Sequence, residues 1–355
     1  MKKALPLALE NAAVVTECWT FEKLAVIQTS PLAEDWLASH LRLYIDTCFC
    51  AHFGETSDLH RPMYYDDLLH SRQLDYRRFT PETIVGAVKE QLEEGRYVSL
   101  YADWSLGQGE PAFHELLFYG YDDERQALLA PLLKNRTFCP VWIPYSYIES
   151  TFPSVLDYFK ADPPRELHLA VFYQGPMTTY SLRSDYPTDS CVYMAMDKIS
   201  KEIYGTQSSV SVVSDSLSTY DAPVYYTGSA CIKALEQVLL WEIQGKPFAD
   251  CYRGLTMVLK AMHEHRNLLL LSMKYIQKTW ALPDSCVGAE IRDYQDCCEQ
   301  FRIWYCLGLK YEQTADKRIL QQMVSGLFSA FSKERRTLLN FHRKASENWA
   351  LRRFQ

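Results

Sequence analysis

A histidine at the start of a predicted strand is the residue of this chain best placed to do chemistry. Residues 95–130 are typical of three strands in succession, and a loop with two glycines and a proline at 105–111 separates the first two. His114 is the first polar side chain of the second strand, Phe113–Tyr121. A strand that leaves such a loop can hold a general base in a fixed place. The same position also suits a histidine at the edge of the core, with its ring hydrogen-bonded to the fold.

A histidine base needs a nucleophile, and the 11 cysteines of the chain supply candidates. A thiol at the N-terminus of a helix loses its proton more readily because the helix dipole favours the thiolate. Residues Ser30–Ile45 have the cap and the apolar spacing of a helix, and Cys48 and Cys50 follow it. If a second short helix begins at Thr47, Cys48 lies beside its N-terminus. On that interpretation Cys48 is the nucleophile and His114 is its base.

Several other polar residues are candidates for a functional role, but each also has an ordinary structural interpretation. Ser30 stands at a helix start and is a substitute nucleophile, although a serine before proline usually caps the helix. Asp122 or Asp123 can orient His114 only if their turn folds back. Asp103 ends the strand before the loop and either faces a basic substrate or terminates the strand. The pair Cys18-Trp19 is expected to pack in the core.

No pattern in the sequence predicts a metal or a cofactor. The close cysteine pairs, Cys48-Phe-Cys50 and Cys297-Cys298, lack the Cys-x-x-Cys spacing of structural zinc sites. In His263-Glu-His265 the two histidines would point about 200° apart on a helix, which is the wrong geometry for one shared ion. We therefore expect neither a metal nor a cofactor.

Composition and charge narrow the classes of function. The net charge of −7 does not favour a general nucleic-acid surface, and no run of 18 apolar residues predicts a membrane span. The apolar run near the N-terminus is too short and too interrupted to be typical of a signal peptide. An odd number of scattered cysteines suits a reducing compartment, so we expect a cytoplasmic protein. Residues 333–355 carry seven Lys or Arg against two Glu. Such a basic end either solvates a surface or contacts an acidic partner.

The remaining elements divide the chain into an α+β front half and a helical back half. Val14–Gln28 is typical of one or two short strands, and Thr80 predicts the cap of a helix over Pro81–Glu94. Asp162–Arg165 favours a domain boundary. Beyond Thr227 the apolar spacing predicts four helices, over Ser229–Gln244, Phe248–Trp280, Val287–Glu312 and Ala315–His342.

The order of these elements is similar to that of a papain-like thiol fold. Residues His114–Asp123, HELLFYGYDD, resemble the N-terminal domain of the butirosin-biosynthesis acyltransferase (BtrH) family. More distantly they resemble the double-glycine leader peptidases of bacteriocin exporters. The segment Gly228–Leu235, the pair His265-Arg266 and the last helices with Trp304 are similar to the helical region of the BtrH family.

This resemblance implies a fold and a function. The fold is α+β, with a papain-like domain at residues 1–160, a strand-helix bridge at 161–226 and a helical domain at 227–355. The function is acyl transfer, in natural-product biosynthesis, from an acyl or peptidyl carrier-protein thioester to an amine of a small molecule or peptide. The transfer uses a Cys/His site, here Cys48 and His114, and needs no cofactor, nucleic acid or membrane.

Two departures from the family pattern open alternatives. The positions that the leader peptidases would use for the cysteine and the acid fall near Trp36 and Ala130. An indole is no nucleophile towards a carbonyl carbon, and a methyl group cannot orient an imidazole. The alternatives to the acyltransferase are a non-catalytic pseudoenzyme that serves as a binding or scaffold module, a cysteine peptidase-like hydrolase, and a hydrolase that uses Ser30.

Overall fold

The chain forms two compact units of mixed helix and sheet. The computed structural model describes residues 1–10, 12–16, 18–54, 67–134, 137–163, 166, 175–209, 224–249 and 252–353. Unit 1 comprises Met1–Ala33 and Pro62–Tyr186, and unit 2 comprises Glu34–Arg61 and Pro187–Gln355. These units do not coincide with the expected segments 1–160, 161–226 and 227–355, because residues 34–61 group with the C-terminal helices.

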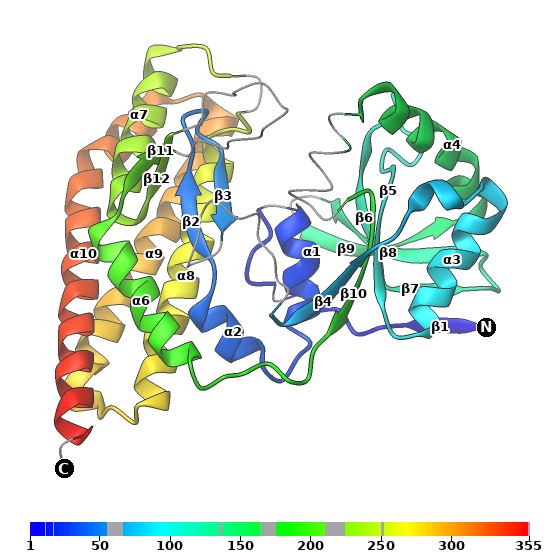
Figure 1. The fold of residues 1–355 in the computed structure, drawn as a ribbon. Coiled ribbons are helices and arrows are strands. Elements are labelled where there is room, and N and C mark those ends of the chain that lie inside the picture. Colours follow the sequence, from blue (N-terminus) through cyan, green and yellow to red (C-terminus); the bar gives the residue numbers. More distant parts are fainter. Residues whose placement is uncertain are drawn as a thin grey trace. The chain divides into compact units, whose positions relative to one another are not determined.

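Unit 1 contains two antiparallel four-stranded sheets, with strand orders β4-β10-β5-β6 and β1-β7-β8-β9 among the described residues (Figure 1). Residues from both sheets and from two helices, α3 and α4, share one hydrophobic core. The elements of unit 1 are β1 (Lys2–Ala4), α1 (Cys18–Ile27), β4 (Leu69–Gln73), a 3-10 turn (Tyr76–Arg78), α3 (Pro81–Glu93), β5 (Tyr97–Asp103), β6 (Phe113–Phe118), β7 (Gly120–Asp122), β8 (Ala127–Lys134), β9 (Thr137–Pro144), α4 (Tyr145–Ala161) and β10 (Met177–Leu182).

The sequence predicted most of the elements around this core. The three strands of residues 95–130 are present as β5, β6 with β7, and β8. Helix α3 begins where expected: the Thr80 backbone N–H donates to Thr83 Oγ1 at 2.8 Å in a capping box. Its residues Ile84 and Val88 are fully buried. Residues 167–173, which the sequence also favours as a strand, lie outside the described residues.

Helix α1 replaces the strands that we expected at Val14–Gln28. From Phe21 to Ile27 every residue is buried, including Glu22 and Lys23. A helix that is buried all round has no polar face, so its sequence lacks the 3.6-residue alternation that marks an amphipathic helix. Its aromatic and β-branched residues favour a strand by propensity, and packing overrides that preference.

Unit 2 combines one antiparallel sheet, of order β11-β12-β2-β3, with long helices (Figure 1). The predicted C-terminal helices are present, with shifted ends. The elements of unit 2 are α2 (Ala33–Ser39, whose first residue belongs to unit 1), β2 (Arg42–Ile45), β3 (Ala51–Gly54), α6 (Cys191–Tyr204), β11 (Gln207–Ser209), β12 (Val224–Thr227), a 3-10 turn (Gly228–Ala230), α7 (Cys231–Gln244), α8 (Leu255–Thr279), α9 (Asp284–Thr314) and α10 (Lys317–Arg353).

The helix expected from Ser30 to Ile45 is wrong in its second half. Helix α2 ends at Ser39, Leu41 has a positive φ of 64°, and the chain continues as strand β2. A non-glycine residue in this left-handed region breaks the helix and reverses the chain. Arg42–Ile45 then pairs with Ala51–Gly54 as a hairpin.

No helix among the described residues has both the length and the apolar content needed to cross a membrane.

Candidate active site

The Cys18 thiol and the His114 ring are in contact within unit 1. Cys18 Sγ lies 3.3 Å from His114 Nε2. Cys18 is the first residue of helix α1, and His114 is the second residue of strand β6. The pair therefore combines a thiol at a helix start with an imidazole on a strand, which is the arrangement of an activated cysteine nucleophile.

The Glu115 carboxylate lies beside both His114 and Cys18. Its Oε2 lies 3.0 Å from His114 Nδ1, and its Oε1 lies 4.0 Å from Cys18 Sγ. Neighbouring residues on a strand normally point to opposite faces. Here the longer glutamate side chain nevertheless reaches the far nitrogen of the histidine ring. A carboxylate at Nδ1 fixes the ring so that Nε2 faces the thiol.

Helix α1 is held in place by contacts on two sides. Towards β5 and β10, Ser99 Oγ donates to Glu22 Oε2 at 3.3 Å, and Lys23 Nζ lies 5.9 Å from the centre of the Tyr180 ring. On another side of the helix, Phe21 stacks on Phe138 of β9 with ring centres 3.5 Å apart. The helix is thus packed against strands of both sheets, and this packing fixes the position of the thiol.

The loop before His114 is braced by a buried carboxylate. Asp103 Oδ1 accepts the backbone N–H groups of Ser105 and Ala112 at 3.0 Å each, and Oδ2 accepts the Tyr147 hydroxyl at 2.8 Å. Burial raises the pKa of Asp103, but these hydrogen bonds outweigh it and hold the pKa below its usual range. Asp103 therefore fastens both ends of the loop that leads to His114.

Aromatic rings flank the histidine. The Trp104 ring lies nearly parallel to the His114 ring, with centres 5.1 Å apart, and Tyr101 lies nearly parallel to it at 6.4 Å. Trp104 keeps 38% of its surface exposed. It therefore forms a wall of the site that solvent, or a substrate, can reach.

The electrostatics of the pair follow from burial and from Glu115. Burial disfavours the charged imidazole, but the contacts with Cys18 and Glu115 outweigh it and raise the pKa of His114 to about 11. Burial also raises the pKa of the Cys18 thiol, and the hydrogen bond from His114 opposes that rise only in part. The histidine is therefore cationic over a wide pH range, while the thiolate becomes abundant only above neutral pH.

A second carboxyl group lies behind this site. Glu22 is fully buried, and burial together with the negative charge of Glu115 raises the pKa of Glu22 to about 8. Burial acts to raise the pKa of Glu115 as well, but the bond with His114 outweighs it and lowers that pKa. Glu22 thus stays protonated near neutral pH, and Glu115 carries the charge that faces the imidazole.

The predicted nucleophile Cys48 is not the thiol that contacts His114. Cys48 belongs to unit 2, in the turn between β2 and β3, where its backbone N–H donates to Asp46 Oδ1 at 2.9 Å. The short helix expected at Thr47 is absent, because the chain forms a hairpin turn there. The sequence predicted that Cys18 packs in the core, and it did not predict the contact of Cys18 with His114.

The two departures noted in the sequence are explained by their places in the fold. Trp36 lies in α2 of unit 2 and stacks on His40 with ring centres 4.6 Å apart. Ala130 is fully buried in β8, opposite Val141. Cys18 and Glu115 are the thiol and the carboxylate that contact His114.

Three other candidates take ordinary structural roles. Ser30 Oγ accepts the Leu32 backbone N–H at 3.1 Å in the turn that precedes α2. Asp122 Oδ1 accepts backbone N–H groups of its own turn. Asp123 binds Lys89 Nζ at 2.6 Å. None of these contacts involves His114.

The site also has the donors of a metal ligand set, since Sγ, an imidazole nitrogen and a carboxylate oxygen lie within 4.8 Å of one another. Direct contact of Cys18 with His114, and of His114 with Glu115, equally suits proton transfer without an ion. Adding a chelator distinguishes the two possibilities, because it would remove a bound ion and leave direct proton transfer between these residues unaffected.

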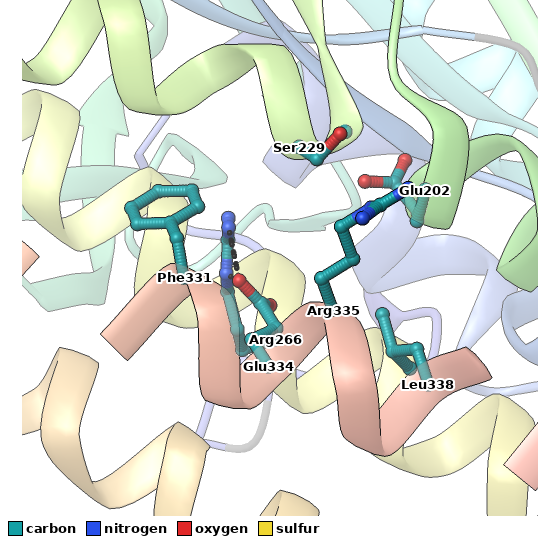
Figure 2. A pocket seen from close by; sticks show the side chains of 8 residues that line it. Glu202, Ser229, Arg266, Phe331, Glu334, Arg335 and Leu338 are labelled. Carbon is teal, nitrogen blue, oxygen red and sulfur yellow. Dashed lines mark hydrogen bonds and ion pairs between the residues drawn. The ribbon is translucent and has the colours of Figure 1, made fainter. Parts of the chain in front are cut away.

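Unit 2 contains a small hollow of a different character (Figure 2). Arg266 extends into it and is bound to Glu334 by two hydrogen bonds, of 2.9 and 3.1 Å. Glu202, Ser229 and Arg335 line the same hollow. Glu202 and Glu334 balance the two guanidinium groups, so the charged side chains that line the hollow carry no strong net charge.

Neither the protein-family models nor the curated proteins include a match to this chain.

Proposed function

We propose that this protein is a cysteine acyltransferase that uses Cys18 as nucleophile, His114 as acid and base, and Glu115 to orient the histidine. The contact of 3.3 Å between Cys18 Sγ and His114 Nε2, with Glu115 at the other ring nitrogen, carries the proposal. It replaces Cys48 by Cys18 in the nucleophile's role and keeps His114.

The reactive form is a thiolate–imidazolium pair. In it Cys18 has lost its proton, and His114 carries one proton on each nitrogen, directed to Sγ and to Glu115. Burial makes this pair a minority species near neutral pH, because it raises the pKa of the thiol. The high pKa of His114, about 11, keeps the imidazole protonated once the thiolate forms.

Acylation begins when the thiolate attacks the carbonyl carbon of an acyl thioester. A Cys18 Sγ–carbon bond forms, the carbon–sulfur bond of the donor breaks, and the departing thiolate takes the proton from His114 Nε2. This step leaves an acyl-cysteine and a neutral imidazole that is still hydrogen-bonded to Glu115.

Transfer follows when an amine attacks the acyl-cysteine. His114 Nε2 takes a proton from the attacking nitrogen, the carbon–Sγ bond breaks, and an amide leaves. The thiolate–imidazolium pair is restored. If water takes the place of the amine, the same residues hydrolyse the acyl group, which is the peptidase-like alternative.

The papain-like fold and membership of the BtrH family remain part of the proposal. Two features support them: a cysteine at the start of a buried helix, and a histidine on a strand of an adjacent sheet. The family resemblance implies a carrier-protein thioester as donor and an amine of a small molecule or peptide as acceptor. It also implies a place in natural-product biosynthesis.

The experiment is mass spectrometry of the intact chain mixed with an acyl thioester, such as an acyl N-acetylcysteamine or an acylated carrier protein. We expect one acyl adduct, located at Cys18 by peptide mapping, and its decay when amines are added. Cys18→Ala should form no adduct, whereas Cys139→Ala, a partly exposed thiol of the same unit, should acylate normally. His114→Ala should slow acylation by about 10²–10⁴-fold.

Three results separate the alternatives. An adduct on Cys48 would restore the earlier assignment, and an adduct that decays equally fast without amine would favour a hydrolase. No adduct with any thioester, in a folded protein, would favour the non-catalytic binding module. A chelator in the buffer should leave acylation unchanged, and loss of acylation would point to a metal at this site.

A further inference from the structure

The hairpin turn of unit 2 brings three metal-ligating side chains together. Asp46, Cys50 and His52 each offer one ligand atom, and these atoms all lie within 4.8 Å of one another. All three belong to the short stretch that joins β2 to β3 or to the start of β3 itself. We propose that this turn binds a zinc ion through the Asp46 carboxylate, the Cys50 thiolate and the His52 imidazole.

The separation of two of these ligands already matches a tetrahedral ion. His52 Nε2 lies 3.4 Å from Asp46 Oδ2. Zinc bonds of about 2.1 Å to nitrogen and oxygen place two such ligands about 3.4 Å apart in a tetrahedron. The sulfur needs at most a small movement of its side chain to complete three corners.

The turn fixes the carboxylate independently of any ion. Asp46 Oδ1 accepts the backbone N–H groups of Cys48 and Cys50 at 2.9 Å each. The other oxygen, Oδ2, is the one that faces His52. Hydrogen bonds of this kind orient a ligand before the metal arrives and so reduce the entropy lost on binding.

Aromatic contacts hold the turn in place against the rest of unit 2. The His52 ring stacks on Tyr44, its cross-strand neighbour, with ring centres 5.2 Å apart. Phe49, which has a positive φ of 62°, packs edge-on against the rings of Trp241 and Phe248. The turn is thereby anchored to helix α7, through Trp241.

The chemical types of the three ligand atoms favour zinc over other divalent ions. One thiolate, one imidazole and one carboxylate suit zinc, which accepts sulfur, nitrogen and oxygen ligands in a tetrahedral arrangement. Magnesium and calcium prefer oxygen alone. Three protein ligands leave the fourth position for water. The set uses one cysteine and no Cys-x-x-Cys pair, so cysteine spacing alone does not reveal it.

The test is a zinc titration of the full chain against a chromophoric chelator, in a Cys18→Ala background. That background disables the other candidate ligand set, Cys18 with His114 and Glu115, and makes the result independent of acyl transfer. We expect one zinc ion per chain. With cobalt in its place we expect a thiolate-to-metal charge-transfer band and the intense visible bands of a tetrahedral ion.

Matched variants assign the ligands. Cys50→Ser and His52→Gln should each weaken zinc binding by about tenfold or more. Asp46→Asn keeps an oxygen for the two backbone bonds of the turn but loses the charge, so it should weaken binding while the fold is retained. Cys48→Ser, in the same turn but outside the ligand set, should bind zinc like the parent.

The proposal is overturned if the parent binds no zinc, or if cobalt gives no thiolate band. It is also overturned if Cys50→Ser and His52→Gln bind as tightly as Cys48→Ser. Circular dichroism of each variant without metal separates lost ligation from lost folding. If one variant is unfolded, the isosteric Asp46→Asn change decides alone.

Discussion

The hydroxyl of Tyr147 donates a hydrogen bond of 2.8 Å to Asp103 Oδ2, and its oxygen accepts the Gly107 backbone N–H at 2.9 Å. Helix α4 thus holds the middle of the loop whose two ends Asp103 already fastens. The loop leads directly into the strand that carries His114. Its geometry therefore sets where the imidazole stands.

Removing this hydroxyl should loosen the loop without disturbing the core. For Tyr147→Phe we expect a loss of about 1 kcal/mol of unfolding free energy, since one hydrogen-bonding group is removed and the ring remains. Acyl transfer should fall by up to about 10²-fold through misplacement of His114. Steady-state kinetics and urea denaturation measure the two effects. Thr151→Ala is the matched control, because the Thr151 hydroxyl bonds only to carbonyls of its own helix.

The reactivity of Cys18 should increase towards alkaline pH. Burial raises the pKa of this thiol above the ordinary 9.0, so the thiolate fraction is small at neutral pH and grows as the pH passes that value. The rate of iodoacetamide alkylation at Cys18, followed by peptide mass spectrometry, should rise accordingly. A rate that levels off below pH about 8 would contradict the effect of burial.

The neighbours of Cys18 should shift that profile in opposite directions. The His114 hydrogen bond lowers the pKa of the thiol, and the Glu115 charge raises it. His114→Ala should therefore move the alkylation midpoint to higher pH, and Glu115→Gln should move it to lower pH. A shift of both variants in one direction would show that the two side chains do not act on Cys18 as their positions indicate.

Glu22 should make the protein less stable as the pH rises. Its pKa in the folded protein is about 8, against 4.5 for an ordinary glutamate. The folded state therefore holds a proton that the unfolded state has released, and the stability present below pH 4.5 is lost as the pH rises through 8. One pKa unit corresponds to about 1.4 kcal/mol, so the loss amounts to a few kcal/mol.

Glu22→Gln removes this dependence because the amide does not titrate. We expect the variant to be similar to the parent near pH 5 and more stable than the parent near pH 9, in urea denaturation series at each pH. The glutamine Oε1 of this variant can still accept the hydrogen bond that the Ser99 hydroxyl donates to Glu22 in the parent. If the parent and the variant lose stability in parallel between these pH values, another group is responsible.

Breaking the buried pair of Arg266 and Glu334 should strongly destabilise unit 2. Both side chains are almost fully buried, and Glu334 Oε1 also accepts the Tyr294 hydroxyl at 3.0 Å. Replacing one partner leaves the other as an uncompensated buried charge, so Arg266→Met should cost about 3–5 kcal/mol in unfolding free energy. The double variant Arg266→Met with Glu334→Gln should recover part of this loss.

A surface pair provides the comparison. Arg302 and Glu299 form an exposed pair on α9 and are hydrated in both the folded and the unfolded state. Arg302→Met should change the urea midpoint little. Equal effects of the Arg266 and Arg302 changes would mean that burial does not determine the strength of the pair at Arg266.

The sequence predicted the strand of His114, the capped helix α3 and the C-terminal helices because each has a local signal. Turn residues, a capping box and apolar spacing act over a few positions. Helix α1 has no such signal, since packing surrounds it on every side and removes the polar face that would show its period. The sequence therefore did not reveal that Cys18 stands at the start of a helix.

The contact between Glu115 and His114 could not be predicted for a different reason. The sequence shows a glutamate next to a histidine on a strand, and strand geometry places such neighbours on opposite faces. Only the reach of the side chain brings Oε2 to Nδ1. Side-chain length beside a candidate histidine is the signal that would have identified it.

The way the chain alternates between the two units limits how the protein can be dissected. Residues 34–61 leave unit 1 after helix α1 and supply strands β2 and β3 to the sheet of unit 2, before the chain returns at Pro62. A fragment cut after Tyr186 would keep these two strands but lose β12, the neighbour of β2. The bare edge of β2 would invite pairing between copies. A self-sufficient thiol unit would instead need a linker in place of residues 34–61.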